Sequence, residues 1–152
     1  MKTLENVRTD HLVWFARAAL GSVLALNIEC ALAFILWPEQ YAGAFELNGL
    51  PGKLAVQSLG ILFLMWNVTY PPVLLTPRAQ KTLFAVILAQ QLIGLAGETW
   101  LLLQLPAGHP ALWQTGQRFI LFDGIGFLLM GTAYLGLSIR VRPAKTETDR
   151  HG

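Results

Sequence analysis

Four stretches of mostly apolar residues constrain this 152-residue chain more than any other feature. A helix that crosses a bilayer needs about 20 such residues, because each residue adds ~1.5 Å to its length. Connectors that contain glycine and proline, which mark turns, separate the stretches. The sequence therefore predicts an all-α integral membrane protein, a four-helix bundle over residues 1–139, followed by a charged tail over residues 140–152. The predicted helices cover residues 17–37, 53–75, 82–105 and 118–139, and Pro71-Pro72 is expected to bend or end the second.

The composition agrees with this class of protein. Hydrophobic residues make up 54% of the chain and charged residues only 13%, whereas soluble domains carry about 25% charged residues. The net charge of +2 is too small to indicate a nucleic-acid surface, so no nucleic-acid partner is predicted. No polar segment is long enough to bury a core of its own. Any functional site is therefore expected within the helices or against them, and the lipid bilayer is the first predicted partner.

Cysteine and histidine are too scarce for several kinds of site. Cys30 is the only cysteine, which excludes a disulfide within the chain, a CxxC redox pair and a cysteine zinc site. The three histidines, His11, His109 and His151, fall outside the apolar stretches, so a pair of histidines for a haem is missing. No ExxH pairing supports a carboxylate metal centre either. We therefore predict no metal and no other cofactor.

The basic residues predict an orientation, because loops on the cytoplasmic side are rich in Lys and Arg. With both termini on the cytoplasmic side of a bacterial-type inner membrane, nine of the 11 basic residues lie inside and only Lys53 and Arg118 lie outside. The inside set is Lys2, Arg8, Arg17, Arg78, Lys81, Arg140, Arg142, Lys145 and Arg150. Tyr70 is then expected near the inner membrane interface, where tyrosine and tryptophan concentrate.

Polar side chains recur at similar depths inside the predicted helices. Ionisable groups at such depths are costly and point to a function or to a polar partner. At ~1.5 Å per residue, Glu29 lies roughly 12 Å from the outer end of its helix, Glu98 roughly 10 Å and Asp123 roughly 8 Å. We predict a polar cluster in the outer half of the bilayer. Its members are Glu29, Gln57, Glu98, Arg118 and Asp123.

Helical spacing predicts which faces point inward. The predicted inward stripes are Ser22, Ala25, Glu29 and Ala33 on the first helix, and Gln57, Gly60, Leu64 and Asn67 on the second. On the third and fourth helices they are Gln91, Gly94 and Glu98, and Asp123, Gly126 and Met130. Small residues beside the polar ones allow helices to approach closely. Four side-chain amides are expected to form hydrogen bonds that pack the helices together: Asn27, Asn67, Gln90 and Gln91.

Three interpretations of the polar cluster remain open. It is a pocket that binds a small amphipathic molecule, such as a quinone. Alternatively, its carboxylates pair with another chain, and the protein is an accessory subunit of a larger membrane complex or a homo-oligomer. In the third, Glu98 or Asp123 transfers protons in an intramembrane enzyme, because burial raises a carboxyl pKa toward neutrality. No substrate and no second catalytic group can be named, so the sequence does not favour an enzyme.

Short motifs give the chain a resemblance to a known group. Arg17-Ala-Ala-Leu-Gly21 opens the first helix, and Gly49-Leu50-Pro51-Gly52 leads into Ser58-Leu59-Gly60-Ile61-Leu62. In these pieces and in its layout the chain resembles the DoxX-like small four-helix bacterial membrane proteins. The glycine–lysine ending of their first helix is absent, and Asn27-Ile28-Glu29 lies nearby instead. The resemblance implies a four-helix membrane fold, and some members are similar to subunits of quinone-linked sulfur oxidation. It assigns no functional residue.

Overall fold

The computed structural model describes the backbone of residues 2–139 and the side chains of residues 10–139, and within this part it contains helices and no strands. Four helical segments are long and apolar enough to cross a membrane, which confirms the predicted all-helical chain with four candidate spans. The predicted tail over residues 140–152 lies outside the described residues. In chain order the elements are α1 (Lys2–Leu36), α2 (Pro38–Ala42), the 3-10 helix η1 (Gly43–Phe45), α3 (Gly49–Asn67), α4 (Tyr70–Leu75), α5 (Lys81–Leu103) and α6 (Pro110–Ile139).

The first and last long helices begin earlier than predicted. α1 begins at Lys2 rather than at residue 17, and α6 begins at Pro110 rather than at residue 118. Hydropathy detects the apolar part of a helix, whereas the helix itself continues through polar residues that still form backbone hydrogen bonds. Proline fits the first turn of α6 because its missing N–H has no partner there in any helix. The first turn is closed by Trp113, whose backbone N–H donates to the carbonyl of His109 at 3.0 Å.

The second candidate span is interrupted. α3 ends at Asn67 and α4 begins at Tyr70, so the break comes just before Pro71-Pro72, as the prolines predict. Pro71 has no N–H to donate to the preceding turn, and its ring clashes with that turn. Both prolines then lie in the first turn of α4, where proline is tolerated.

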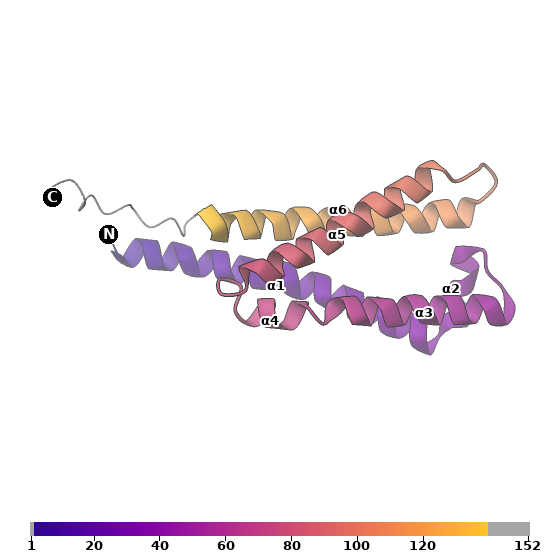
Figure 1. Ribbon diagram of the computed structural model, residues 1–152, viewed down its shortest axis with the longest axis horizontal. Coiled ribbons are helices and arrows are strands. Elements are labelled where there is room, and N and C mark those ends of the chain that lie inside the picture. The colour runs from indigo at the N-terminus through magenta and orange to yellow at the C-terminus, as the bar shows by residue number, and fades with distance from the viewer. Residues whose placement is uncertain (1, 140–152) are drawn as a thin grey trace, which may run out of the picture.

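The long helices run side by side, so the molecule is elongated and has two distinct ends. α1 packs against both α3 and α6, α5 packs against α6, and α4 contacts α1 and α5. Figure 1 shows the start of α1 and the end of α6 at one end of the molecule, which we call the terminal end. α2 and residues 104–109 lie at the opposite end, the loop end. Toward the loop end, α5 diverges from α3.

Two apolar clusters lie along this length. The terminal-half cluster contains the fully buried side chains of Leu20, Phe84, Ile87 and Met130, together with Tyr70. The loop-half cluster centres on Phe34, Ala42 and Val56, with Phe45, Phe63 and Phe119 packed against them. On α6, Asp123 falls between Phe119 of one cluster and Met130 of the other. A polar layer therefore separates the two apolar regions.

A glycine sets the contact between α1 and α3. A Cβ atom built on Gly60 would lie 2.7 Å from the backbone oxygen of Ala31 and 2.8 Å from the side chain of Ile35. A backbone atom cannot move aside as a flexible side chain can, so only glycine allows this approach. Small residues serve the same purpose in other membrane helix pairs.

Candidate functional site

A cavity of about 260 Å³ lies in the polar layer, where the four long helices face one another. Its walls combine carboxylate, amide and aromatic side chains. It is lined by Leu26, Asn27 and Cys30 from α1, Phe63, Trp66 and Asn67 from α3, Gln91, Gly94 and Glu98 from α5, and Arg118, Phe119, Phe122 and Asp123 from α6. We call it the polar cavity.

Asp123 is held in place by α5. The side-chain amide of Gln91 donates to Asp123 Oδ1 at 2.6 Å, and the hydroxyl of Tyr70 donates to Gln91 Oε1 at 3.3 Å. A Cβ atom on Gly94 would lie 2.6 Å from Asp123 Oδ2, so the carboxylate occupies the space that a side chain at position 94 would need. The glycine and the glutamine one turn earlier therefore fix both the position and the orientation of Asp123.

Glu98 lies one turn beyond Gly94 on the same face of α5. Unlike Asp123 Oδ1, one carboxylate oxygen of Glu98 lacks a hydrogen bond within the described chain. Its Oε2 atom is buried and has no hydrogen-bond partner among the described residues. Buried polar atoms normally have a partner, because losing contact with water without one is costly. The polar cavity thus presents an acceptor for which the described part of the chain supplies no donor.

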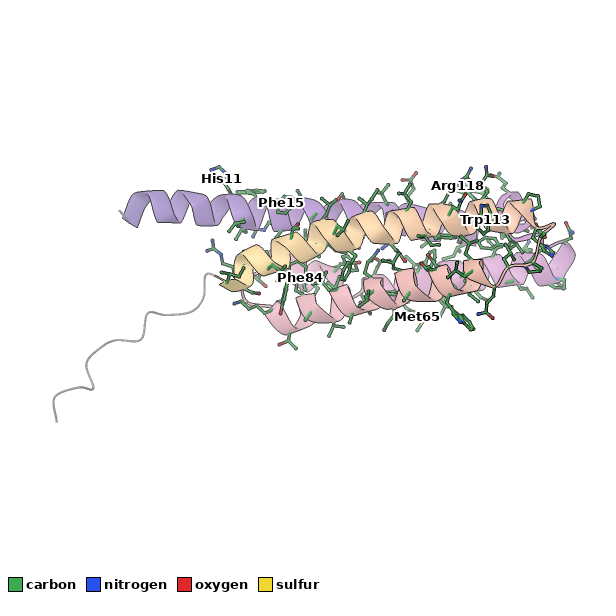
Figure 2. All side chains as sticks on the ribbon, turned by 90° about the horizontal axis from the view of Figure 1, so that it is seen from above. His11, Phe15, Met65, Phe84, Trp113 and Arg118 are labelled. Atoms are coloured by element: carbon green, nitrogen blue, oxygen red, sulfur yellow. The ribbon has the colours of Figure 1, made fainter. Side chains whose placement is uncertain are left out.

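Arg118 stands at the edge of the polar cavity. Its side chain is exposed, and it forms no ion pair with any residue between 10 and 139, the range whose side chains the structure describes. Figure 2 shows Arg118 near Trp113, toward the loop end, with His11 and Phe15 far away along the molecule. Arg118 is the one basic residue that lines the polar cavity within the described chain.

Two asparagines form the opposite wall. The Asn27 amide donates to Asn67 Oδ1 at 3.3 Å, which joins α1 to α3. The Asn67 amide in turn donates to the backbone oxygen of Phe63 at 2.6 Å. The sequence predicts helix-packing hydrogen bonds for both residues but does not predict that they pair with each other.

The structure brings Glu98, Arg118 and Asp123 to one cavity but leaves Glu29 and Gln57 out of it. Glu29 is exposed, because it lies roughly 200° around the α1 axis from Asn27, which faces inward. Gln57 instead donates to the backbone oxygen of Ile35 at 3.1 Å and joins α3 to α1. The predicted five-residue cluster is thus reduced to three members.

Tyr70 was missed as a member of the polar layer. The sequence places it at the inner membrane interface, yet its ring is 1% exposed and its hydroxyl contacts Gln91. Interface tyrosines and buried tyrosines share the same sequence pattern near a helix end. The sequence feature that could have indicated this role is Gln91, which lies seven residues before Glu98 on the same helical face. A buried amide at that depth calls for a second polar group beside it.

A second cavity of about 310 Å³ lies beside the first, toward the loop end. We call it the apolar cavity. It shares Phe63, Glu98 and Phe119 with the polar cavity. The rest of its lining is mostly aliphatic or aromatic: Phe45, Leu59, Leu101, Leu102, Leu105, Leu112, Thr115 and Gly116.

Polar contacts join neighbouring segments at the loop end of the molecule, beside the apolar cavity. Thr115 Oγ1 donates to the backbone oxygen of Ala44 at 2.8 Å. Glu46 and His109 pair at 2.5 Å between Oε2 and Nδ1, which joins the two loops. The hydrogen bond from His109, supported by the backbone N–H groups of Leu112 and Ala111, holds the pKa of the Glu46 carboxyl below its usual range. These N–H groups belong to the first turn of α6, where a negative charge is favourable.

A second exposed pair lies nearby. Lys53 Nζ is 2.8 Å from Glu39 Oε1, and this contact lowers the pKa of Glu39. Among the described residues, no group of three His, Cys, Asp or Glu side chains converges to hold a metal ion. The chemistry available at the site is therefore hydrogen bonding and charge pairing by two carboxylates, one guanidinium and several amides.

No protein-family model, curated protein or solved structure matches the chain. What the cavities can bind must therefore be inferred from their own residues.

Proposed function

We propose that the chain is a small multi-pass protein of a bacterial inner membrane that binds a small amphipathic molecule. In this proposal the four long helices form a bundle, both termini are cytoplasmic, and the loop end faces outward. Three observations support it: the four candidate spans, the position of the start of α1 and the end of α6 at the same end of the molecule (Figure 1), and the distribution of Lys and Arg. The resemblance to DoxX-like membrane proteins agrees with the same layout.

The unpartnered oxygen of Glu98 is the observation that carries the proposal. Inside a bilayer a carboxylate is rare, and it normally pairs or lines a polar space. Glu98 does line such a space, together with Asp123 and Arg118. A ligand that donates a hydrogen bond to Glu98 Oε2 would remove the cost of leaving that atom unpaired.

The joined cavities explain why the ligand should be amphipathic. One cavity offers carboxylates and amides, and the neighbouring one offers mostly leucine and phenylalanine. Ligand sites generally combine apolar walls with a few well-placed polar groups. Lipid-soluble molecules of this kind, including quinols, would reach the site from the bilayer.

Native mass spectrometry of the protein, gently extracted from its host membranes, tests the proposal. The wild-type protein should carry a bound small molecule, and Glu98→Gln should lose it, because the amide weakens pairing with the ligand. Glu29→Gln is the matched control, since Glu29 is also a glutamate within a candidate span but lies outside the cavity. Equal retention of the molecule by Glu98→Gln and by wild type would contradict the proposal.

A second function is favoured by one observation. Glu29 is exposed near the middle of α1's apolar part, where lipid would otherwise surround it. A polar group from another membrane chain would lower that cost, as expected for an accessory subunit. In that case Glu29→Gln should release protein subunits that co-purify at fixed ratio with wild type, while Glu98→Gln keeps them.

A further inference from the structure

Glu98 stands at the junction of the two cavities. Phe63, Glu98 and Phe119 belong to the lining of both, so the polar and apolar spaces meet at these three side chains. A molecule whose polar head contacts Glu98 therefore has an apolar space immediately beside that head. This continuity constrains the shape of the ligand as well as its polarity.

We propose that the ligand is a single-chain amphiphile whose protonated amine head lies between Glu98 and Asp123, with its alkyl tail in the apolar cavity. This inference rests on the proposed function, because it assigns the chemical class of ligand for the same site. It excludes a neutral head such as that of a quinone or an alcohol as the preferred occupant.

The charges of the polar cavity favour a cationic head. Glu98 and Asp123 face a single basic residue, Arg118, whose side chain is exposed at the cavity edge. With both carboxyl groups ionised, the cavity is one positive charge short of balance. An ammonium group carries three donors, which suits an unpartnered acceptor on Glu98 and a fixed carboxylate on Asp123.

Aromatic rings provide the second argument for a cation. Four aromatic side chains line the polar cavity: Phe63, Trp66, Phe119 and Phe122. At Gly94 a Cβ atom would meet both Asp123 Oδ2 at 2.6 Å and the indole of Trp66 at 3.7 Å, so the ring lies close to the carboxylate. Aromatic rings near a carboxylate form a setting that attracts organic cations, and tryptophan is the strongest of these rings.

The apolar cavity sets the length of the tail. It extends along α6 from Phe119, at the shared wall, to Leu112 near the loop end. These residues are seven positions apart on one helix, which corresponds to roughly 10 Å. An extended octyl chain has about this length.

The test uses the full chain in lipid nanodiscs and measures binding of n-alkylamines from hexylamine to hexadecylamine, with the matching n-alkanols. Octylamine should bind at least about tenfold more tightly than octanol, and Glu98→Gln should remove that preference, since charge-assisted hydrogen bonds are the stronger ones. Affinity should rise with chain length up to octyl and then level off.

Two tryptophan variants test the position of the tail. Leu105 lines the apolar cavity, so Leu105→Trp should shorten the preferred chain to hexyl or less. Leu103 is 79% exposed and lines neither cavity, so Leu103→Trp should leave the preference unchanged. Equal chain-length profiles for the two variants would overturn the assignment of the tail.

The outcomes separate this inference from the proposed function. Octanol binding as tightly as octylamine would overturn the amine head. A native ligand that Glu98→Gln releases but that contains no amine would likewise overturn the inference and leave the proposed function standing. If Glu98→Gln changes neither the native ligand nor any probe, both proposals fail.

Discussion

The two halves of this molecule are built from the same long helices, but their interiors differ. In the terminal half, Leu20, Phe84, Ile87 and Met130 are fully buried and fill the space between the helices. Toward the loop end, α5 diverges from α3 (Figure 1). The polar cavity lies in the layer between the two halves, and the apolar cavity lies beside it in the loop half. The comparison suggests that one half holds the helices together, while the other half is left open for a ligand. Substitutions can break or sharpen this contrast.

The largest expected effect comes from emptying the terminal half. Phe84→Ala should destabilise the protein by about 3–5 kcal/mol, because it removes a fully buried ring that also contacts Tyr134 at 5.4 Å between centroids. Phe63→Ala, which enlarges two existing cavities, should cost less than half as much. Unfolding in mixed micelles, followed by circular dichroism, measures both. Equal losses would remove the distinction between the halves.

A smaller effect is expected where α1 and α3 touch. Gly60→Val should destabilise by about 1–3 kcal/mol, because its Cβ would lie 2.7 Å from the backbone oxygen of Ala31. Gly97→Val is the matched control, since a Cβ there meets nothing within 4 Å. The same unfolding assay should find the control close to wild type. A control as unstable as Gly60→Val would mean that the cost arises from valine in a helix rather than from the contact.

The polar layer should contribute somewhat less. Gln91→Leu removes the donor to Asp123 Oδ1 and the acceptor of the Tyr70 hydroxyl, which should cost about 1–2 kcal/mol. Gln90→Leu, whose side chain accepts only the Thr69 hydroxyl at 3.3 Å, should cost less. Because Asp123 loses its anchor, Gln91→Leu should also weaken ligand retention. Retention at the wild-type level would show that the carboxylate needs no such positioning.

The smallest effect should come from the contact between Glu46 and His109, which joins the two loops at the loop end. The folded pKa of Glu46 lies below its unfolded value, so its stabilising contribution is present above the unfolded pKa and is lost as the pH falls through the folded pKa. Wild type should therefore melt at a higher temperature than Glu46→Gln at neutral pH, and the difference should disappear in strong acid. A difference that is independent of pH would contradict this role of the carboxylate.

The sequence predicts the spans well and the inward faces less well. Bilayer thickness fixes the length of an apolar stretch, so four candidate spans follow from composition alone. Depth along a helix also follows from counting, which is why Glu98 and Asp123 could be expected at one level. Rotation about the helix axis does not follow from depth. On α1 the small-residue stripe through Ser22 and Glu29 suggested the inward face, yet Asn27 and Cys30 line the cavity instead.

The sequence also did not predict where some helices begin or which loop residues pair, and the reasons are physical. The start of α6 at Pro110 depends on backbone hydrogen bonds that hydropathy does not record. The pairing of Glu46 with His109 joins loops 63 residues apart, and neither residue stands out in its local sequence. Such contacts depend on how the helices are placed in space.

Labelling of Cys30 tests the central contrast most directly, because the only cysteine of the chain lines the polar cavity. The comparison variant carries Met130→Cys with Cys30→Ser, which moves the thiol into the filled terminal half, where Met130 is 0% exposed. A small neutral thiol reagent should label Cys30 much faster than the thiol at position 130, and bound octylamine should slow the labelling of Cys30 alone. Equal labelling rates at the two positions, with no protection of Cys30, would contradict the account.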